Sequence, residues 1–173
     1  EKSCFKADFV IVVDLDIGEL DINGVAHSFG LTDQWDVVCA NGYFYDASFR
    51  RRYYDTYPLV ELGNENSSQT ETSIADNRIT WSFFRPGMPL IPVYSAYGGM
   101  AIYKFEAIEN RKYSVIRNND ERVEVRCDHF SLCQDIRNAG FSRILINPAM
   151  TLNYLRFDRG LIRKFMNNAF SKS

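Results

Sequence analysis

Apolar and polar positions along the chain form alternating blocks that predict short strands separated by helices. The first block, Phe9 to Val13, holds five consecutive apolar residues, most of them β-branched, and such a run fits a central strand covered on both faces of a sheet. The next block, residues 20–29, places apolar side chains at helical spacing behind the acids Glu19 and Asp21. It predicts a short helix that covers one face of that sheet.

Turn-forming and polar residues divide the middle of the chain. A second apolar run begins at Trp35 and reaches Asn41-Gly42, a pair that tolerates positive φ and so predicts that the strand ends there in a turn. Residues 43–57 are dense in Tyr, Phe and Arg, whereas residues 61–77 are polar and nearly devoid of large apolar side chains. The polar stretch predicts a mobile loop.

Two glycines interrupt the apolar segment from Pro89 to Tyr103. Gly98 and Gly99 follow two extended, proline-containing stretches and precede another apolar strand. Glycine lets the backbone approach a neighbouring group closely, and a plain β-bulge or hairpin turn is the simpler interpretation of the pair. Both interpretations stay open at the level of sequence.

The last third of the chain alternates again between strand and helix patterns. Residues 123–127 and 143–148 read as strands. Between them, Asp128 is placed to be the N-cap of a helix that ends at Gly140. The apolar positions of that helix are Phe130, Leu132, Cys133 and Ile136. Residues 161–170 predict an amphipathic helix that docks on the sheet or on a neighbouring domain.

Composition narrows the class of protein. The 173 residues are 46% hydrophobic and 14% aromatic, which suits one α/β domain over the whole chain and excludes global disorder. The net charge of −2, with both signs interleaved, does not suit a nucleic-acid surface. No apolar run reaches the ~20 residues of a membrane span and the charged start is no secretory signal, so we expect a soluble chain, without choosing between the cytoplasm and the Golgi lumen.

Four cysteines lack the spacing of a metal-binding pair. They are Cys4, Cys39, Cys127 and Cys133. Most lie within or beside apolar segments, which favours buried free thiols over cystines formed in an oxidising lumen.

Two carboxylates at the end of the first apolar run carry the clearest chemistry. Asp14 and Asp16 are two residues apart, so on an extended strand both side chains point the same way and can bind one hard cation. Mn²⁺ or Mg²⁺ held there would neutralise the charge that builds on a leaving diphosphate, as a nucleotide-sugar enzyme requires. Solvated acids that end a strand or cap a helix are the structural alternative.

The order of these segments resembles a GT-A glycosyltransferase and is similar to the fungal capsule-associated mannosyltransferase group and its relatives. The resemblance covers about residues 8 to 154. It runs through Val13-Asp14-Leu15-Asp16 as the DxD motif, Trp35-Asp36-Val37-Val38 as the neighbouring core strand, residues 53–59 and 95–103, Cys127-Asp128-His129, Gly140-Phe141 and Ile146-Asn147-Pro148.

The resemblance implies a fold, a reaction and roles for individual residues. The fold would be a GT-A-like mixed sheet flanked by helices, and the reaction an inverting transfer of a hexose from a nucleoside diphosphate sugar to a hydroxyl of a glycan or glycoprotein. Asp14 and Asp16 would hold Mn²⁺ or Mg²⁺, with Asp14 also near the donor diphosphate, and Asp128 would be the base. The donor-sugar and acceptor pocket would be lined by Tyr97, Gly98 and Gly99.

The chain departs from the GT-A pattern at its start. A GT-A domain normally places a βαβ region that binds the nucleotide base and ribose well before its DxD motif, whereas Asp14 lies close to the first residue of this chain. We therefore expect the chain to correspond to the C-terminal catalytic half of such a domain. A preceding half or a neighbouring domain would supply the nucleotide-base site.

Residues beside these motifs have structural interpretations as well. His129 could contact the metal or the donor diphosphate, or simply pack as a helix residue. His27 is expected to be structural. Most aromatic residues of the 43–57 segment are expected to pack, although their rings could instead stack on an acceptor sugar. The run from Arg50 to Arg52 is expected to form a solvated face, although it could instead bind phosphate or an anionic acceptor.

Two other functions are weighed beside sugar transfer. Paired aspartates at a strand end also suit a Mg²⁺-dependent phosphoesterase, but a nucleophilic Asp would need a nearby Lys and Thr, and no matching Lys-bearing motif is evident. A non-catalytic sugar-binding module of the same ancestry would keep the pocket without the chemistry.

Overall fold

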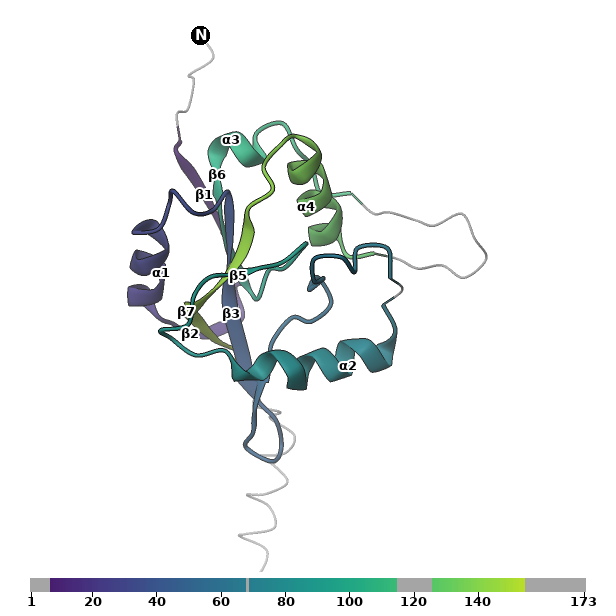
Figure 1. Cartoon of the computed structure of the whole chain (residues 1–173). Helices are drawn as coiled ribbons and strands as arrows, with labels where there is room; N and C mark the ends of the chain where they lie inside the picture. Colours follow the sequence, from purple (N-terminus) through teal and green to yellow (C-terminus); the bar gives the residue numbers. More distant parts are fainter. Residues whose placement is uncertain (1–6, 68, 115–125, 155–173) are drawn as a thin grey trace, which may run out of the picture.

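The computed structural model describes residues 7–67, 69–114 and 126–154. Within them, seven strands form one mixed sheet that curls into a half-barrel, and four α-helices flank it (Figure 1). The strands are β1 (Phe9–Val13), β2 (Ile17–Leu20), β3 (Val37–Tyr45), β4 (Arg51–Tyr53), β5 (Ile91–Pro92), β6 (Met100–Lys104) and β7 (Ile144–Tyr154). The helices are α1 (Ile22–Phe29), α2 (Glu71–Thr80), α3 (Phe105–Ile108) and α4 (Asp128–Asn138), with the short 3-10 helix η1 (Trp81–Phe83) after α2.

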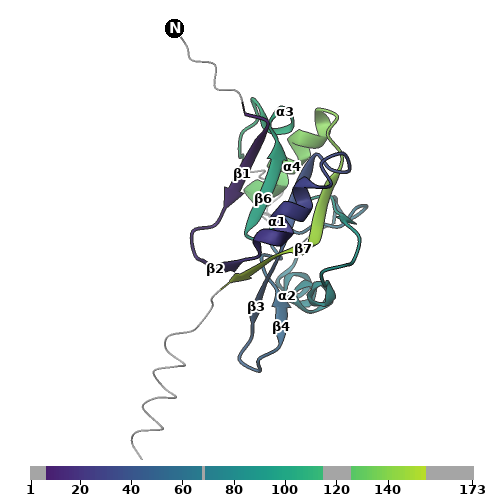
Figure 2. The same ribbon diagram turned by 90° about the vertical axis from the view of Figure 1, so that its left-hand side faces the viewer.

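The sheet has the strand order β1-β6-β3-β7-β2, with β4 paired to β3 and β5 paired to β7. The β3–β7 pair is parallel and the other pairs are antiparallel. α1 covers one face of the sheet, and α4 lies on the opposite face (Figures 1 and 2). The prediction of an α/β chain with a mixed sheet flanked by helices is therefore confirmed.

The central strand β3 divides the core into two layers. Val37 and Cys39 point into the cluster that α4 covers, while Val38 and Ala40 point into the cluster on the α1 side. All four side chains are fully buried. Because side chains alternate along a strand, a continuous apolar run is what a strand with a layer on each face requires.

The first strand does not occupy the central position that its sequence predicts. Among the described residues β1 pairs only with β6 and forms an edge of the sheet. Ile11 and Val13 are 49% and 39% exposed, so one face of β1 lacks a covering layer. An apolar run signals burial on both faces but does not say which neighbour provides it, and the prediction of a doubly covered strand is wrong for this structure.

The Asn41-Gly42 pair does not end β3, which continues to Tyr45. Gly42 is needed for a different reason: a Cβ atom there would lie 2.2 Å from the carbonyl oxygen of Gly98. Asn41 is buried and its Nδ2 donates to the carbonyl of Pro148 at 3.1 Å. The pair thus serves close packing between segments rather than a turn, and the predicted turn is wrong. The turn comes later, between β3 and β4.

The segment after β1 holds a strand that the sequence pattern concealed. β2 occupies Ile17–Leu20 and pairs with β7, so the helix α1 begins at Ile22 and not at Leu20. Asp21 is its N-cap, and the Asp21 carboxylate accepts hydrogen bonds from the backbone N–H groups of Asn23 and Gly24. An acid at this position therefore caps the helix as well as favouring its dipole.

Part of the polar stretch 61–77 is helical. α2 begins at Glu71 behind a capping box, in which Thr70 and Ser73 each bond the backbone N–H of the other. No residue of α2 is buried, which is why an apolar periodicity is missing from its sequence. The expectation of a loop is therefore wrong for the part of the stretch that α2 occupies. The sequence marks this helix by its capping residues and not by an apolar face.

The elements of the last third agree largely with their prediction. The four apolar positions predicted for α4 are all buried, and Gly140 just beyond the helix has φ of +96°. Cys127, not Asp128, is the N-cap residue, and Asp128 is the first residue of the helix. β7 passes through Pro148 because the register with β3 shifts between Ala40 and Asn41, which leaves that part of β7 outside the ladder. The segments 123–125 and 161–170 lie outside the described residues.

Within the described segments, no helix has the length and apolar character needed to cross a bilayer. Cys39 and Cys133 are buried free thiols, as predicted, and Cys127 is a partly exposed free thiol. Cys4 lies outside the described residues.

Candidate functional site

Asp14 and Asp16 lie in the turn that joins β1 to β2, not on an extended strand. Asp14 is half-buried and Asp16 is exposed. The backbone N–H of Asp14 donates to the carbonyl of Gly99 at 2.9 Å. The chain thus ties the first predicted acid to the glycine pair through the backbone.

Tyr97 connects the DxD turn with the start of α4. Its hydroxyl donates to Oδ1 of Asp14 at 3.3 Å, and its ring stacks on the ring of His129 with centroids 3.9 Å apart. Tyr97 itself is buried. Three residues that the sequence singled out separately, Asp14, Tyr97 and His129, therefore form one continuous contact.

The imidazole of His129 lies between two tyrosine rings. Tyr97 stacks on one side, and Tyr113 makes an edge contact with centroids 5.2 Å apart. Burial lowers the pKa of His129, although the carboxylates of Asp128 and Asp14 act in the opposite direction. The buried Nδ1 atom has no hydrogen-bond partner among the described residues. A buried ring nitrogen without a partner is unusual and is available to a ligand.

Asp128 presents an exposed carboxylate at the first turn of α4. Its Oδ1 accepts the backbone N–H of its neighbour His129 at 2.9 Å and the thiol of Cys127 at 3.3 Å. These bonds hold the carboxylate beside the imidazole.

A third acid that the sequence did not single out, Asp55, lies among those already described. It follows β4 with φ of +61° and is half-buried, and its carboxylate accepts the backbone N–H of Gly98. Burial raises the pKa of Asp55 to about 7; the charges of Asp14 and Asp128 add to the rise, and the Gly98 N–H opposes it. The clue in the sequence was a lone acid inside the aromatic 53–59 segment, but no spacing connects it to the DxD motif.

Two tyrosines support the acids of the turn: Tyr54, one of the aromatic residues that the sequence left between packing and sugar contact, and Tyr154, which the sequence did not single out. Their rings stack with centroids 3.8 Å apart. The hydroxyl of Tyr154 donates to the carboxylate of Asp16, and the hydroxyl of Tyr54 lowers the pKa of Asp14 by hydrogen bonding. The pair thus braces both acids of the turn from β4 and from the end of β7.

The backbone of the glycine pair packs closely against other segments of the chain. Gly98 and Gly99 have φ of +68° and +85°, and a Cβ atom on Gly98 would lie 2.1 Å from the carbonyl oxygen of Ala40. The backbones of the pair bond Asp14 and Asp55, as described above. Gly98 and Gly99 therefore position two acids, and their predicted contact with a donor sugar stays a prediction.

The prediction that Asp14 and Asp16 hold a divalent cation stays a prediction. No set of three or more His, Cys, Asp or Glu side chains in the described part of the chain is arranged to hold a metal ion. Burial raises the pKa of Asp14, the hydroxyl of Tyr97 opposes this, and the neighbouring carboxylate of Asp16 raises it further. A hard cation such as Mn²⁺ or Mg²⁺ would relieve this repulsion, and with only two carboxylates from the protein it would need phosphate oxygens and water to complete its shell.

The remaining candidates lie away from this cluster or serve the fold. Nδ1 of His27 lies 3.2 Å from Nδ2 of Asn147, so His27 packs at the junction of α1 and β7. The predicted solvated arginine face is only partly correct: Arg52 pairs with Asp46 at 2.8 Å, and Arg51 is half-buried against backbone carbonyls.

Comparison with protein-family models and with curated proteins found no match to this chain.

Proposed function

We propose that this chain is the catalytic part of a GT-A-like, metal-dependent glycosyltransferase that moves a hexose from a nucleoside diphosphate sugar to a hydroxyl of a glycan or glycoprotein. One observation carries the proposal. Tyr97 bonds Asp14 and stacks on His129, so the acid pair, the glycine segment and the start of α4 meet in one place. The resemblance of the sequence assigns its metal, sugar and base roles to these same segments.

Asp14 and Asp16 would hold Mn²⁺ or Mg²⁺ through their carboxylates. Tyr97, Tyr54 and Tyr154 orient these carboxylates by the contacts already described. The bound ion would supply positive charge to the leaving diphosphate of the donor. The tyrosine braces restrict the rotamers of both acids, which reduces the entropy lost when a cation binds.

Asp128 would take the proton of the acceptor hydroxyl as its oxygen attacks the anomeric carbon. The carboxylate is exposed and is oriented by the N–H of His129. The unpartnered Nδ1 of His129 would bond the donor between the base and the acid pair. The charges of Asp14 and Asp128 both act on Asp55, and negative potential of this kind stabilises the positive charge that develops on a sugar ring during transfer.

Glycosyl transfer from a panel of nucleoside diphosphate hexoses to glycan acceptors tests this proposal. Asp128→Asn keeps the shape of the side chain and removes the proton acceptor, so turnover should fall by a factor on the order of 10² to 10⁴ while donor binding survives. Asp135→Asn, an exposed acid on the same helix, is the matched control and should transfer sugar like the parent.

The stereochemistry of the product provides an independent readout. Inversion of the anomeric configuration agrees with a single displacement assisted by Asp128. Unchanged turnover in Asp128→Asn, or retention of configuration, would remove the base assignment. Hydrolysis of phosphate esters by the parent without any sugar transfer would instead favour the phosphoesterase.

A further inference from the structure

We propose that Arg51 and Arg85 form a binding site for the phosphate group of an ester, on the side of the β3–β4 hairpin that faces η1. The inference goes beyond sugar transfer and does not depend on it. It rests on two guanidinium groups that the fold brings to the same backbone carbonyls, and neither forms an ion pair with an acid in the part of the chain that the structure describes.

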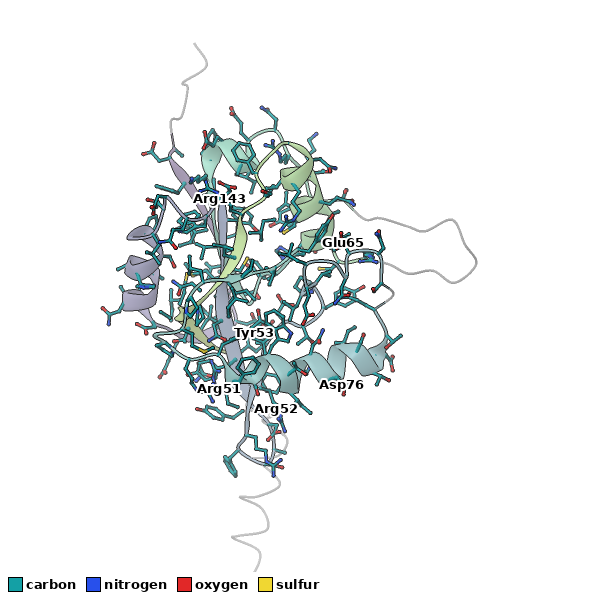
Figure 3. The ribbon with its side chains drawn as sticks, in the orientation of Figure 1. Arg51, Arg52, Tyr53, Glu65, Asp76 and Arg143 are labelled. Carbon is teal, nitrogen blue, oxygen red and sulfur yellow. The ribbon has the colours of Figure 1, made fainter. Side chains whose placement is uncertain are left out.

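The two arginines converge on the same pair of acceptors. Nη1 of Arg51 donates to the carbonyls of Ser82 and Phe84 at 3.0 and 3.1 Å. Nη1 of Arg85 donates to the same carbonyls at 2.7 and 2.9 Å. Because both nitrogens bond the same oxygen atoms, the two positive charges lie side by side. Figure 3 shows Arg51 of this pair, where β4 meets the end of α2.

Within residues 7–67, 69–114 and 126–154, no carboxylate forms an ion pair with this arginine pair. Each ion pair found among the described residues involves Arg52, Lys104 or Arg143, and neither Arg51 nor Arg85 takes part in one. Burial, and next the charge of Arg85, lower the pKa of Arg51. Two guanidinium groups held together against their repulsion are stabilised by an anion placed between them.

The geometry leaves donors available for such an anion. The carbonyl bonds use only Nη1 of each arginine, so Nε and Nη2 of both groups can bond oxygen atoms. The guanidinium of Arg51 is fixed over the ring of Tyr43, with Cζ 4.3 Å from the ring centre. A planar guanidinium fork matches two phosphate oxygens, and fixing the fork in advance reduces the entropy lost on binding.

The surroundings of the pair suit the phosphate of an ester that carries an apolar or sugar moiety. Phe83, between the two acceptor carbonyls in sequence, is 55% exposed, and Phe49 at the tip of the hairpin is 87% exposed with φ of +55°. The ring of Phe83 offers apolar contact beside the charge, and the ring of Phe49 adds exposed apolar surface on the same hairpin. The ester can be soluble or the headgroup of a lipid, and the experiment separates the two sources.

Binding is measured by calorimetry with inorganic phosphate and by co-sedimentation with phosphatidylcholine vesicles that contain or lack phosphatidic acid. A chelator keeps divalent cations away from Asp14 and Asp16, so failure of the metal-site proposal cannot affect the outcome. Arg85→Gln is the main variant because Arg85 is exposed and its loss leaves the core intact. Arg51→Lys is the second variant, since it keeps the charge and removes the fork. Arg50→Gln, an exposed arginine of the same hairpin, loses the same charge without touching the pair.

The proposal predicts that the parent binds phosphate and that Arg85→Gln and Arg51→Lys weaken binding by about tenfold or more, while Arg50→Gln changes it by less than about twofold. Binding of free phosphate alone identifies a soluble ester, and retention on the phosphatidic acid vesicles identifies a lipid headgroup. Equal losses in Arg85→Gln and Arg50→Gln would show charge attraction without a site and overturn the proposal. So would a parent that binds neither probe.

Discussion

The hydroxyl of Tyr97 bonds Oδ1 of Asp14 at 3.3 Å across a separation of 83 residues in sequence. On its other side the same ring stacks on His129. Tyr97 therefore joins the turn after β1 to the first turn of α4, although the two segments belong to distant parts of the chain. The proposed metal site and the proposed base are linked through this one side chain.

Tyr97→Phe tests that link. The variant keeps the stacked ring and loses only the hydroxyl, so we expect a cost of about 1 kcal/mol in stability and weaker binding of Mn²⁺ by a few-fold. Titration of Mn²⁺ followed by calorimetry measures the affinity. Tyr45→Phe, on the exposed end of β3, is the control and should bind Mn²⁺ like the parent. A Tyr97→Phe variant with unchanged Mn²⁺ affinity would show that the hydroxyl does not orient Asp14.

Gly98→Ala should unfold the site through a clash with the backbone of β3. The added Cβ would lie 2.1 Å from the carbonyl oxygen of Ala40, and the residue has a positive φ, so we expect a loss of about 3 kcal/mol or more in the free energy of unfolding. Gly87→Ala is the matched control, since Gly87 also has a positive φ but faces open space. It should cost about 1 kcal/mol. If urea denaturation shows that both variants lose the same free energy of unfolding, close packing at Gly98 is unimportant.

Asp55→Asn should change how stability depends on pH. The pKa of Asp55 is raised from 3.8 to about 7 in the folded chain, so the folded state binds more protons than the unfolded state between these values. The stability contributed by the neutral carboxyl is present below about pH 4 and is lost as the pH rises to 7. Asparagine stays neutral, so the free energy of unfolding of the variant should rise relative to that of the parent as the pH rises through this window. With solvent screening allowed for, the difference should reach about 2 kcal/mol at pH 8.

Urea denaturation from pH 4 to 8 with a chelator present measures the effect. Asp46→Asn provides a control of opposite sign, because backbone N–H groups led by that of Arg50 lower the pKa of Asp46. The stability that the Asp46 carboxylate contributes is present at neutral pH and is lost on acidification. If the free energy of unfolding of Asp55→Asn relative to the parent does not change between pH 4 and 8, the result would contradict the burial of this carboxyl among other acids.

The sequence predicted the elements whose burial follows a simple period. The apolar stripe of α4 and the presence of the core strands β3, β6 and β7 follow from the apolar pattern, although β3 and β7 extend further than predicted, to Tyr45 and Tyr154. It could not place β1, because an apolar run looks the same at the edge of a sheet as at its centre. It also missed α2, whose residues are all at least partly exposed and whose signal is the local capping pair Thr70 and Ser73.

Glycine was the least predictable residue in this chain. Asn41-Gly42 has the composition of a turn, yet Gly42 is a mid-strand residue that lets the Gly98 backbone pack against β3. Whether a glycine supplies a turn or a close approach depends on a segment more than fifty residues away, which no local pattern records.

The candidate site was predicted only in part for a similar reason. Asp14, Asp16 and Asp128 stand out because they follow apolar segments or begin a helix. Asp55 and the stacked Tyr54–Tyr154 pair reach the site through tertiary contacts alone.

Binding of a nucleoside diphosphate to the full-length protein, measured by calorimetry with and without Mn²⁺, tests the central claim most directly. Binding should require Mn²⁺ and should weaken by about 10²-fold or more in Asp14→Asn and in Asp16→Asn, because each variant removes a charged ligand without removing a core side chain. Asp8→Asn, an exposed acid at the other end of β1, should bind like the parent. If the Asp14 and Asp16 variants bind nucleotide and Mn²⁺ as the parent does, these residues are not a metal site and the proposed glycosyltransferase chemistry fails with them.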